Sequence, residues 1–407
     1  MHILYIHQYF KTPSEGGGTR SYFIAKEMIS RGHKVTMLTS DTNGKDSRIE
    51  VVDGMEVIYI PNSYSNNFSI FNRIKSFIGF TVKAIKRASK IKNVDLVYAT
   101  STPLTIGYIA RYLKAIKKLP YIFEVRDLWP EFPIQMGAIK NSFFIKYLRS
   151  FEKRIYDDAI GIVTLSPGME EGVRKTNTSC KQICMIPNMS KPDIFYPREK
   201  NQETLEKFQI DPSAFNVIYF GALGIANGIV YILEAAKQLL DKPNIRFIFL
   251  GDGADRIKIE KYIQQNVTSN VSYLGTLDLF TTSDIANCCN ASLITFLDIP
   301  ILYTNSPNKL FDSLSAGLPV IVNSRGWTKD LVEKNQCGFF VEPTSPEDLA
   351  NKLYKLSLSK EMQNLYSDNA RRLSLTTYDK NKLCSELVDF VEFSYAKLTQ
   401  KYIEIMK

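Results

Sequence analysis

The chain has 407 residues, of which 44% are apolar, 12% aromatic and 23% charged, and its net charge is +9. This composition excludes a mainly disordered, collagen-like or repeat protein, and the length predicts two globular domains. The six cysteines are too sparse for a disulfide scaffold, and they lack the paired C-x2-C spacing of a zinc site, so no bound structural metal is predicted.

The N-terminal residues MHILYIHQYF lack a basic segment before their apolar run, and they predict a buried first strand rather than a signal peptide. Short apolar strands then alternate with helical patterns, which predicts a parallel sheet covered by helices on both faces. The strands expected in this first domain are residues 2–9, 35–40, 55–60, 95–100, 121–127, 160–166 and 182–187.

Charge is unevenly distributed along the chain. Residues 1–200 hold 30 Lys and Arg against 18 Asp and Glu, and the remaining residues hold 21 against 24. Segments 71–92 and 111–118 mix apolar side chains with many of these cations, as in a helix that lies on anionic lipid. A solvated crossover helix packed on the sheet is the alternative, and the absence of any nucleic-acid-binding motif disfavours a nucleic acid partner.

The loop between the first strand and the first helix contains Gly16, Gly17 and Gly18, followed by Arg20. Glycines before a helix N-terminus let backbone N–H groups approach a phosphate, although a plain turn would also use them. After the strand at 121–127, the segment EVRDLWPEFP places Arg126 and Asp127 among other charged residues. Ligands bind at the carboxyl ends of parallel strands, so this segment predicts a functional cluster.

A proline-rich segment at 187–197 predicts the linker, with the boundary at residue 195. Strands are expected again at 216–223, 246–253, 271–275, 291–297 and 319–324, and residues 361–407 have helical patterns throughout. The predicted organisation is a first domain at 1–195, a second at 196–375 and a helical segment at 376–407 that crosses back to the first domain.

Two strand-to-helix turns of the second domain carry Gly221 with Gly224, and Gly251 with Gly253. The segment NSPNKLFDSLSAGLPVIVN predicts a helix that starts near Asn308 and ends at Gly317. Lys309 in the first turn and Asp312 one turn later suit an anion and the hydroxyls of a ribose. This pattern predicts a nucleoside diphosphate site.

Taken in order and spacing, these motifs resemble the retaining glycosyltransferases of family 4, and among them the bacterial transferases of fucosamine and related surface-polysaccharide sugars. The resemblance spans nearly the whole chain and rests on GGGTRSYFIAKEMISRGHKVTMLTS, EVRDLWPEFPIQMG, IVTLSPGMEEGV, IPN, FGALGIANG, LGDG, NSPNKLFDSLSAGLPVIVNSRGW and CGFFVEP. It implies an α/β GT-B fold, with two Rossmann-like doubly wound domains facing a cleft and C-terminal helices on the first domain. It also implies a nucleotide-sugar donor held mainly by the second domain, with no metal or other cofactor.

The resemblance also implies roles for single residues. Asp312 stands at the second position of the family's Glu-x7-Glu motif, whereas the first position falls on Thr304. The family's phosphate-binding Arg and Lys fall on Ala222 and Asn227, so other cations must meet the diphosphate. The expected donor-binding set is Gly17, Gly18, Arg20, Gly221, Gly224, Gly251, Arg256, Asn308, Lys309, Leu310 and Asp312. The expected catalytic residues are Arg126 and Asp127. Arg126 stands where many members of the family have a His.

The resulting expectation is sugar transfer with retention, from a UDP-sugar such as UDP-N-acetylfucosamine to a polyprenyl-diphosphate-linked saccharide in O-antigen or capsule assembly. The basic first domain predicts a cytoplasmic protein bound peripherally to the inner face of the bacterial membrane. A GT-B nucleotide-sugar epimerase and an NAD-dependent oxidoreductase are the alternatives. The second would require G-x-G-x-x-G and an acidic residue after strand two, neither of which is clearly present.

Overall fold

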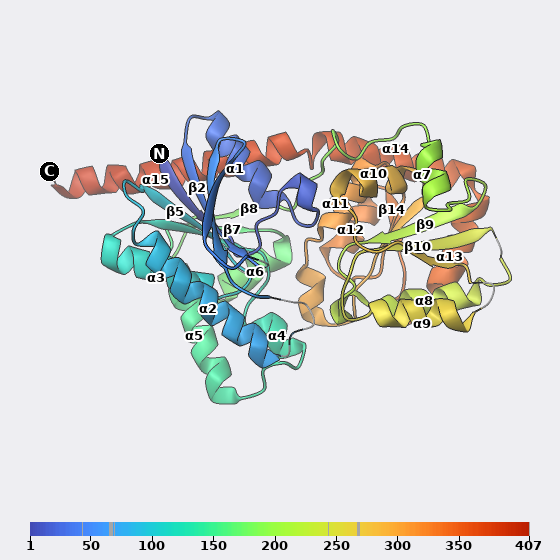
Figure 1. Ribbon diagram of the computed structural model, residues 1–407, viewed down its shortest axis with the longest axis horizontal. Coiled ribbons are helices and arrows are strands. Elements are labelled where there is room, and N and C mark those ends of the chain that lie inside the picture. The colour runs from blue at the N-terminus through green and yellow to red at the C-terminus, as the bar shows by residue number, and fades with distance from the viewer. Residues whose placement is uncertain (43, 65–67, 69, 243, 267–268, 407) are drawn as a thin grey trace. The chain divides into compact units, whose positions relative to one another are not determined.

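The computed structural model describes residues 1–406 except 43, 65–67, 69, 243 and 267–268, and the side chains of 70 and 401–406 are not described. Its contacts divide the chain into two compact units (Figure 1). The first unit comprises Met1–Lys11, Gly18–Pro187 and Asn381–Lys407, and the second comprises Thr12–Gly17 and Asn188–Lys380. Each unit has its own sheet, so the predicted pair of α/β domains is confirmed.

The sheet of the first unit has eight strands in the order β3-β4-β2-β1-β5-β6-β7-β8, and all neighbours are parallel except β3 and β4. The strands are β1 (His2–Ile6), β2 (Lys34–Asp41), β3 (Arg48–Val52), β4 (Met55–Pro61), β5 (Leu96–Thr100), β6 (Tyr121–Val125), β7 (Gly161–Thr164) and β8 (Ile183–Met185). The seven predicted strands are all present. The edge strand β3 was not predicted, because its side chains are mostly exposed and lack a buried apolar run.

Helices cover both faces of this sheet (Figure 1). They are α1 (Arg20–Ser30), α2 (Ile70–Ala88), α3 (Ile106–Lys117), α4 (Glu131–Gln135), α5 (Ser142–Asp158), α6 (Pro167–Lys175) and α15 (Lys380–Met406). Asn141 and Ser166 cap α5 and α6 by accepting from backbone N–H groups at 2.9 and 3.0 Å. The C-terminal helix α15 packs on this unit as expected, and His33 Nε2 lies 2.7 Å from a carboxylate oxygen of Glu392.

The second unit has a six-stranded parallel sheet in the order β11-β10-β9-β12-β13-β14. Its strands are β9 (Phe215–Phe220), β10 (Ile245–Leu250), β11 (Val271–Tyr273), β12 (Ala291–Ile294), β13 (Val320–Val322) and β14 (Gly338–Phe340). Five of them match the predicted strands, and the three-residue β14 was not predicted. Alternate residues of β9 enter two different hydrophobic clusters, Val217 on one face and Ile218 on the other, so both faces are buried.

The helices of the second unit are α7 (Gln202–Lys207), α8 (Ile229–Gln238), α9 (Arg256–Gln265), α10 (Leu279–Asn287), α11 (Asn308–Ser315), α12 (Trp327–Lys334), α13 (Pro346–Leu358) and α14 (Lys360–Thr376). Short 3-10 turns are η1 (Pro13–Glu15), η2 (Ile225–Asn227) and η3 (Pro300–Thr304). The helix predicted to start near Asn308 is α11, and Gly317 follows its end with a φ of +67°. Within the described residues, no helix combines the length and apolar character needed to cross a bilayer.

The chain passes from the first unit to the second after Pro187, earlier than the predicted boundary at residue 195. The cause is a set of hydrogen bonds between the predicted linker and the α11 region. The Asn188 backbone N–H donates to Ser306 Oγ at 3.2 Å, and the Lys191 N–H donates to Ser315 Oγ at 2.9 Å. These bonds make residues 188–191 part of the second unit. The return passage follows Lys380, later than the predicted residue 375.

Candidate active site

The carboxyl ends of β9 and β10 meet in the second unit, and a glycine turn follows each strand. Phe220 pairs with Leu250 at the last register position, so Gly221 and Gly251 lie side by side. A Cβ on Gly251 would lie 1.8 Å from the Gly221 carbonyl oxygen, so Gly251 is required by the close approach of two backbones. A Cβ on Gly221 would lie 3.3 Å from Lys309 Cε, so the absence of a side chain at Gly221 makes room for this lysine.

Lys309 lies in the first turn of α11, and only 8% of the residue is exposed. Its ammonium donates to the Tyr219 hydroxyl and to Asn227 Oδ1 at 3.4 Å, and it lies 3.8 Å from the centroid of the Tyr219 ring. No carboxylate of the described residues lies within ion-pair distance of it. Burial lowers the pKa of Lys309 to about 7. An anion bound here would stabilise the charged form of a lysine that has only neutral partners.

Asp312 lies one turn further along α11 and is buried. Its Oδ1 forms an ion pair with the ammonium of Lys191, which is also buried. Burial raises the pKa of the Asp312 carboxyl, whereas the Lys191 charge opposes that rise. The ion pair occupies one carboxylate oxygen, and the predicted ribose contact would therefore use the other.

Two further residues of the predicted donor set begin α11. Asn308 is the first residue of the helix, and Leu310 is fully buried. The Leu310 N–H already donates to the Pro307 carbonyl at 3.1 Å, so its backbone is used within the first turn. The predicted contact of Leu310 with the donor stays a prediction.

Arg256 and Gly224 lie on the turns that follow the two glycines. Arg256 begins α9, where its Nε donates to Glu260 at 2.8 Å and its guanidinium lies 5.8 Å from the Tyr273 ring centroid. Its side chain is 49% exposed, and its Nη1 also lies 3.9 Å from Asp252 Oδ1. Gly224 precedes η2, and its carbonyl accepts from the Asn227 N–H at 2.9 Å, which fixes the turn that carries Asn227.

A second polar cluster lies at the carboxyl ends of β1, β5 and β6 in the first unit. Ile6 pairs with Ala99, and Thr100 pairs with Glu124, so the residues after these strands are neighbours. Arg126 Nη1 donates to His7 Nε2 at 3.0 Å. Burial, together with the Arg126 charge, lowers the pKa of His7 well below its usual range, so the imidazole is neutral at pH 7.

Asp127 follows Arg126 and is half-buried. Its Oδ2 accepts from the Thr102 hydroxyl at 2.9 Å. Burial raises the pKa of Asp127, although Thr102 and Arg126 favour the ionised form. The structure thus brings together the two predicted catalytic residues, with Arg126 held by His7 and Asp127 held by Thr102.

Arg20 does not face an open site, contrary to the prediction that it meets phosphate. Its Nε pairs with Glu124 at 2.8 Å, and its other nitrogens donate to the backbone carbonyls of Ile186 and Pro187. Both side chains of the ion pair are fully buried. Arg20 therefore ties α1 to β6 and to the end of the first unit, with all three of its nitrogens hydrogen-bonded within the protein.

Two other predicted features of the first domain are Glu131 of the charged cluster and the glycine loop at Gly16, Gly17 and Gly18. Glu131, from the predicted charged cluster, turns away to pair with Arg149 of α5 at 2.7 Å. In the glycine loop, Gly16 and Gly17 have positive φ, and a Cβ on Gly17 would meet no atom within 4 Å. Gly17 and Gly18 lie where the chain passes between the two units. A phosphate contact there stays a prediction.

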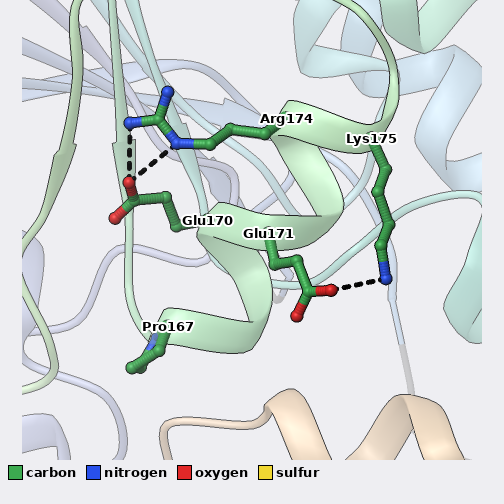
Figure 2. A pocket seen from close by; sticks show the side chains of 5 residues that line it. All are labelled: Pro167, Glu170, Glu171, Arg174 and Lys175. Carbon is green, nitrogen blue, oxygen red and sulfur yellow. Dashed lines mark hydrogen bonds and ion pairs between the residues drawn. The ribbon is translucent and has the colours of Figure 1, made fainter.

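A shallow hollow on α6 offers no competing site. Its lining residues are Pro167, Glu170, Glu171, Arg174 and Lys175, which all come from one helix (Figure 2). The two carboxylates pair with the two cations one turn along, at 2.7 Å in each case. These exposed pairs neutralise one another and leave no group aimed at a ligand.

His7, Thr102, Tyr219 and Lys191 belong to these clusters and were not predicted from the sequence. His7 could have been found, because it follows a strand at the carboxyl edge where ligands bind. Tyr219 lies inside a buried strand and has no local signal of function. Lys191 reaches Asp312 across 121 residues of sequence, and nothing in its neighbours along the chain indicates that contact.

Two glycosyltransferase family models match this chain. The model of the family "Glycosyltransferase Family 4" matches residues 14–192, and the model "Glycosyl transferases group 1" matches residues 200–373. The probable glycosyltransferase WbjE of Pseudomonas aeruginosa is 23% identical over 310 residues, which cover 72% of this chain and 74% of WbjE.

Solved structures show the same fold. WaaG, a glycosyltransferase involved in lipopolysaccharide biosynthesis, is 16% identical with a TM-score of 0.71, covering 95% of this chain and 98% of WaaG. Anabaena HepE in complex with UDP-glucose is also 16% identical with a TM-score of 0.71, covering 96% of this chain and 99% of HepE.

Proposed function

The chain belongs to the GT-B glycosyltransferases of family 4 and group 1, and from that premise we propose that it transfers a sugar from a UDP-sugar to a lipid-linked saccharide with retention. The transferred sugar is proposed to resemble N-acetylfucosamine, and the product to enter O-antigen or capsule assembly. The similarity to the probable glycosyltransferase WbjE supports sugar transfer, and the similarity to WaaG, which is involved in lipopolysaccharide biosynthesis, supports a surface polysaccharide as the product. HepE was solved with UDP and with UDP-glucose, which favours uridine over guanosine.

The observation that carries the proposal is the buried ammonium of Lys309. A buried cation without an acidic partner is costly unless an anion binds beside it. Lys309 lies at a helix N-terminus, where the backbone dipole also favours negative charge. A bound diphosphate would pair with the Lys309 ammonium and would also lie at the positive end of the helix dipole. In this proposal Lys309 replaces the phosphate-binding Arg and Lys that the family has at the positions of Ala222 and Asn227.

The proposed reaction needs stabilisation of a leaving group. The bond between the anomeric carbon and the diphosphate oxygen breaks, and the acceptor oxygen attacks from the same face while its proton passes to the diphosphate. Negative charge develops on the diphosphate, where Lys309 can stabilise it. Arg126 adds electrostatic help in this proposal, and Asp127 orients a sugar hydroxyl. No covalent enzyme intermediate is invoked.

We also propose that transfer is metal-independent. In many nucleotide-dependent enzymes a divalent cation neutralises the leaving diphosphate. Here Lys309 supplies one positive charge from the protein, and the exposed guanidinium of Arg256, which also pairs with Glu260 and Asp252, is proposed to supply a second. Unchanged transfer after chelation by EDTA would support this statement, and activity that returns only with added Mg²⁺ would contradict it.

A peripheral position at an anionic membrane surface is the remaining part of the proposal. The exposed apolar residues Phe71, Ile74, Ile78 and Val82 recur at three- and four-residue spacing on α2. Exposed Lys75, Lys83 and Lys86 share this helix. Ile116 on α3 and Phe143 on α5 are further exposed apolar residues of this unit. Apolar side chains beside cations match the headgroup region of an anionic bilayer.

Thermal-shift titration in EDTA tests the donor assignment. The unmodified protein is titrated with UDP, GDP and NAD, because a ligand that binds only the folded state raises the Tm. We expect UDP to raise the Tm, and Lys309→Met to lose most of that increase. As a control, Lys258→Met removes a lysine of the same unit that already pairs with Asp255 at 2.8 Å. A response to NAD alone, or to none of the three, would overturn the assignment.

A further inference from the structure

His7 differs from the other two histidines of the sequence in its hydrogen bonds. His2 uses both ring nitrogens, with Nδ1 2.9 Å from the Asn93 carbonyl oxygen and Nε2 2.9 Å from Thr36 Oγ1. His33 also uses both, with the N-terminal amine and with Glu392. His7 has one partner, Arg126, and its Nδ1 is buried with no hydrogen-bond partner among the described residues.

The contact with Arg126 fixes the proton on the His7 ring. A guanidinium can only donate, so His7 Nε2 must accept and carries no hydrogen. In a neutral imidazole the hydrogen is then on Nδ1. The lowered pKa of His7 agrees with a neutral ring. His7 Nδ1–H is consequently a donor of known position that lacks an acceptor.

Gln8 follows His7 in the sequence, and its side chain also lacks hydrogen-bond partners. Its side chain is fully buried, and neither amide atom has a hydrogen-bond partner in the described part of the chain. Its backbone is fixed, because the Gln8 carbonyl accepts from the Ser40 N–H at 3.1 Å and from Ser40 Oγ at 2.6 Å. Most buried polar groups in proteins are hydrogen-bonded, so two unsatisfied neighbours at a strand's carboxyl end indicate a ligand position.

We propose that His7 and Gln8 bind hydroxyl groups of a pyranose sugar, an inference that rests on the proposed function. A hydroxyl both donates and accepts, and it can therefore satisfy His7 Nδ1–H, the Gln8 NH2 group and Gln8 Oε1. A phosphate or carboxylate only accepts and would leave Gln8 Oε1 unsatisfied. Arg126 is a positioning residue for His7, because its Nη1 donates to His7 Nε2 at 3.0 Å, and Arg126 itself is half-buried.

The hydroxyls can belong to the transferred sugar or to the acceptor, and two measurements on the full chain distinguish these sources. Calorimetry compares UDP-glucose and UDP-N-acetylglucosamine with UDP, which isolates the contribution of the transferred sugar. Saturation-transfer NMR with methyl glucoside and methyl N-acetylglucosaminide, in the presence of UDP, detects an acceptor-like sugar. If a variant loses the calorimetric difference between UDP-sugar and UDP, the residue contacts the transferred sugar. If it loses the saturation-transfer signal of the methyl hexosides, the residue contacts the acceptor.

The decisive variant is His7→Phe, which keeps the ring shape and removes both nitrogens. We expect about tenfold weaker sugar-dependent binding, with the affinity for UDP unchanged. His7→Gln, which can accept from Arg126 and still donate, should restore much of the loss. Gln8→Glu, which keeps the shape but removes the NH2 donor, provides a second variant if His7→Phe folds poorly.

His2→Phe is the matched control, because it removes a buried histidine at the start of β1, the strand that His7 follows, and both of its nitrogens are used within the protein. It should lower the Tm but leave both sugar signals intact. Equal sugar binding by the unmodified protein, His7→Phe and Gln8→Glu would overturn the inference. Failure of the unmodified protein to bind UDP would instead overturn the proposed function, while the hexoside measurement still tests His7.

Discussion

At the residue scale, the protonation of Lys309 links donor binding to pH. Burial lowers its pKa to about 7, so the free protein releases this proton as the pH rises through 7. A diphosphate stabilises the ammonium and should cause the proton to be taken up again. UDP affinity should therefore fall by up to about tenfold per pH unit above pH 7.

Calorimetry in buffers of different ionisation enthalpy checks this prediction, because proton uptake on binding appears as a buffer-dependent heat. Lys309→Arg should bind UDP without the pH dependence, since a guanidinium stays charged throughout this range. The same affinity at pH 7 and at pH 9 in the unmodified protein would show that Lys309 does not meet the diphosphate.

The ion pair between Lys191 and Asp312 gives a second prediction at this scale. Removing one partner leaves a buried charge uncompensated, and Lys191→Met should reduce the free energy of unfolding by about 3–5 kcal/mol. The double variant Lys191→Met/Asp312→Leu should recover much of the loss, because neither charge remains. Urea unfolding measures both. Equal stability of Lys191→Met and the unmodified protein would mean that the pair contributes nothing to the fold.

Arg20 shows why single side chains are harder to predict than the site itself. Its position beside a glycine loop predicted a phosphate ligand. In the structure its guanidinium instead forms an ion pair with Glu124, which lies 104 residues away in the sequence. Lys309 was predicted correctly as part of a helix N-terminus, because that signal is local. The polar partners of Lys309 come from β9 and η2, and no local pattern identifies them.

At the element scale, α2 is expected to contribute most of the attraction to anionic lipid. Each lysine near an anionic surface contributes about 1 kcal/mol, so Lys75→Gln/Lys83→Gln/Lys86→Gln should weaken vesicle binding by roughly 100-fold. Sedimentation with vesicles containing anionic lipid measures the effect. The matched control replaces three exposed lysines of the second unit, Lys237, Lys261 and Lys355, by Gln.

The control has the same net charge as the α2 variant and should keep most of the binding. Equal losses in the two variants would indicate a general charge effect rather than a surface on α2. Binding to vesicles of neutral lipid should be weak for all proteins, because the apolar stripe alone lacks the electrostatic attraction.

Strands buried on both faces were predictable because they are continuous apolar runs, as in β1 and β9. The edge strand β3 has mostly exposed residues and follows no such rule. Its signal was the Asp53–Gly54 turn, in which both residues have positive φ, as a two-residue hairpin requires. The first unit is therefore a mixed sheet at its edge, although the repeated strand and helix pattern predicted a parallel one.

At the scale of the whole molecule, the division into two units predicts two unfolding transitions. Leu387 of α15 belongs to the core of the first unit, and Leu353 of α13 belongs to that of the second. Each leucine is fully buried, so Leu→Ala should destabilise its own unit by about 2–5 kcal/mol. Differential scanning calorimetry of the two variants assigns a transition to each unit.

UDP then tests where the donor binds. Lys309, Tyr219, Asn227 and the two glycine turns all belong to the second unit. Saturating UDP should therefore raise the Tm of the transition that Leu353→Ala lowers and leave the Tm of the other transition unchanged. At a hundredfold excess over Kd, the expected gain in the free energy of unfolding of the second unit is about 2.7 kcal/mol. If UDP instead raises the transition that Leu387→Ala lowers, the nucleotide is held by the first unit, and the diphosphate role of Lys309 fails with it.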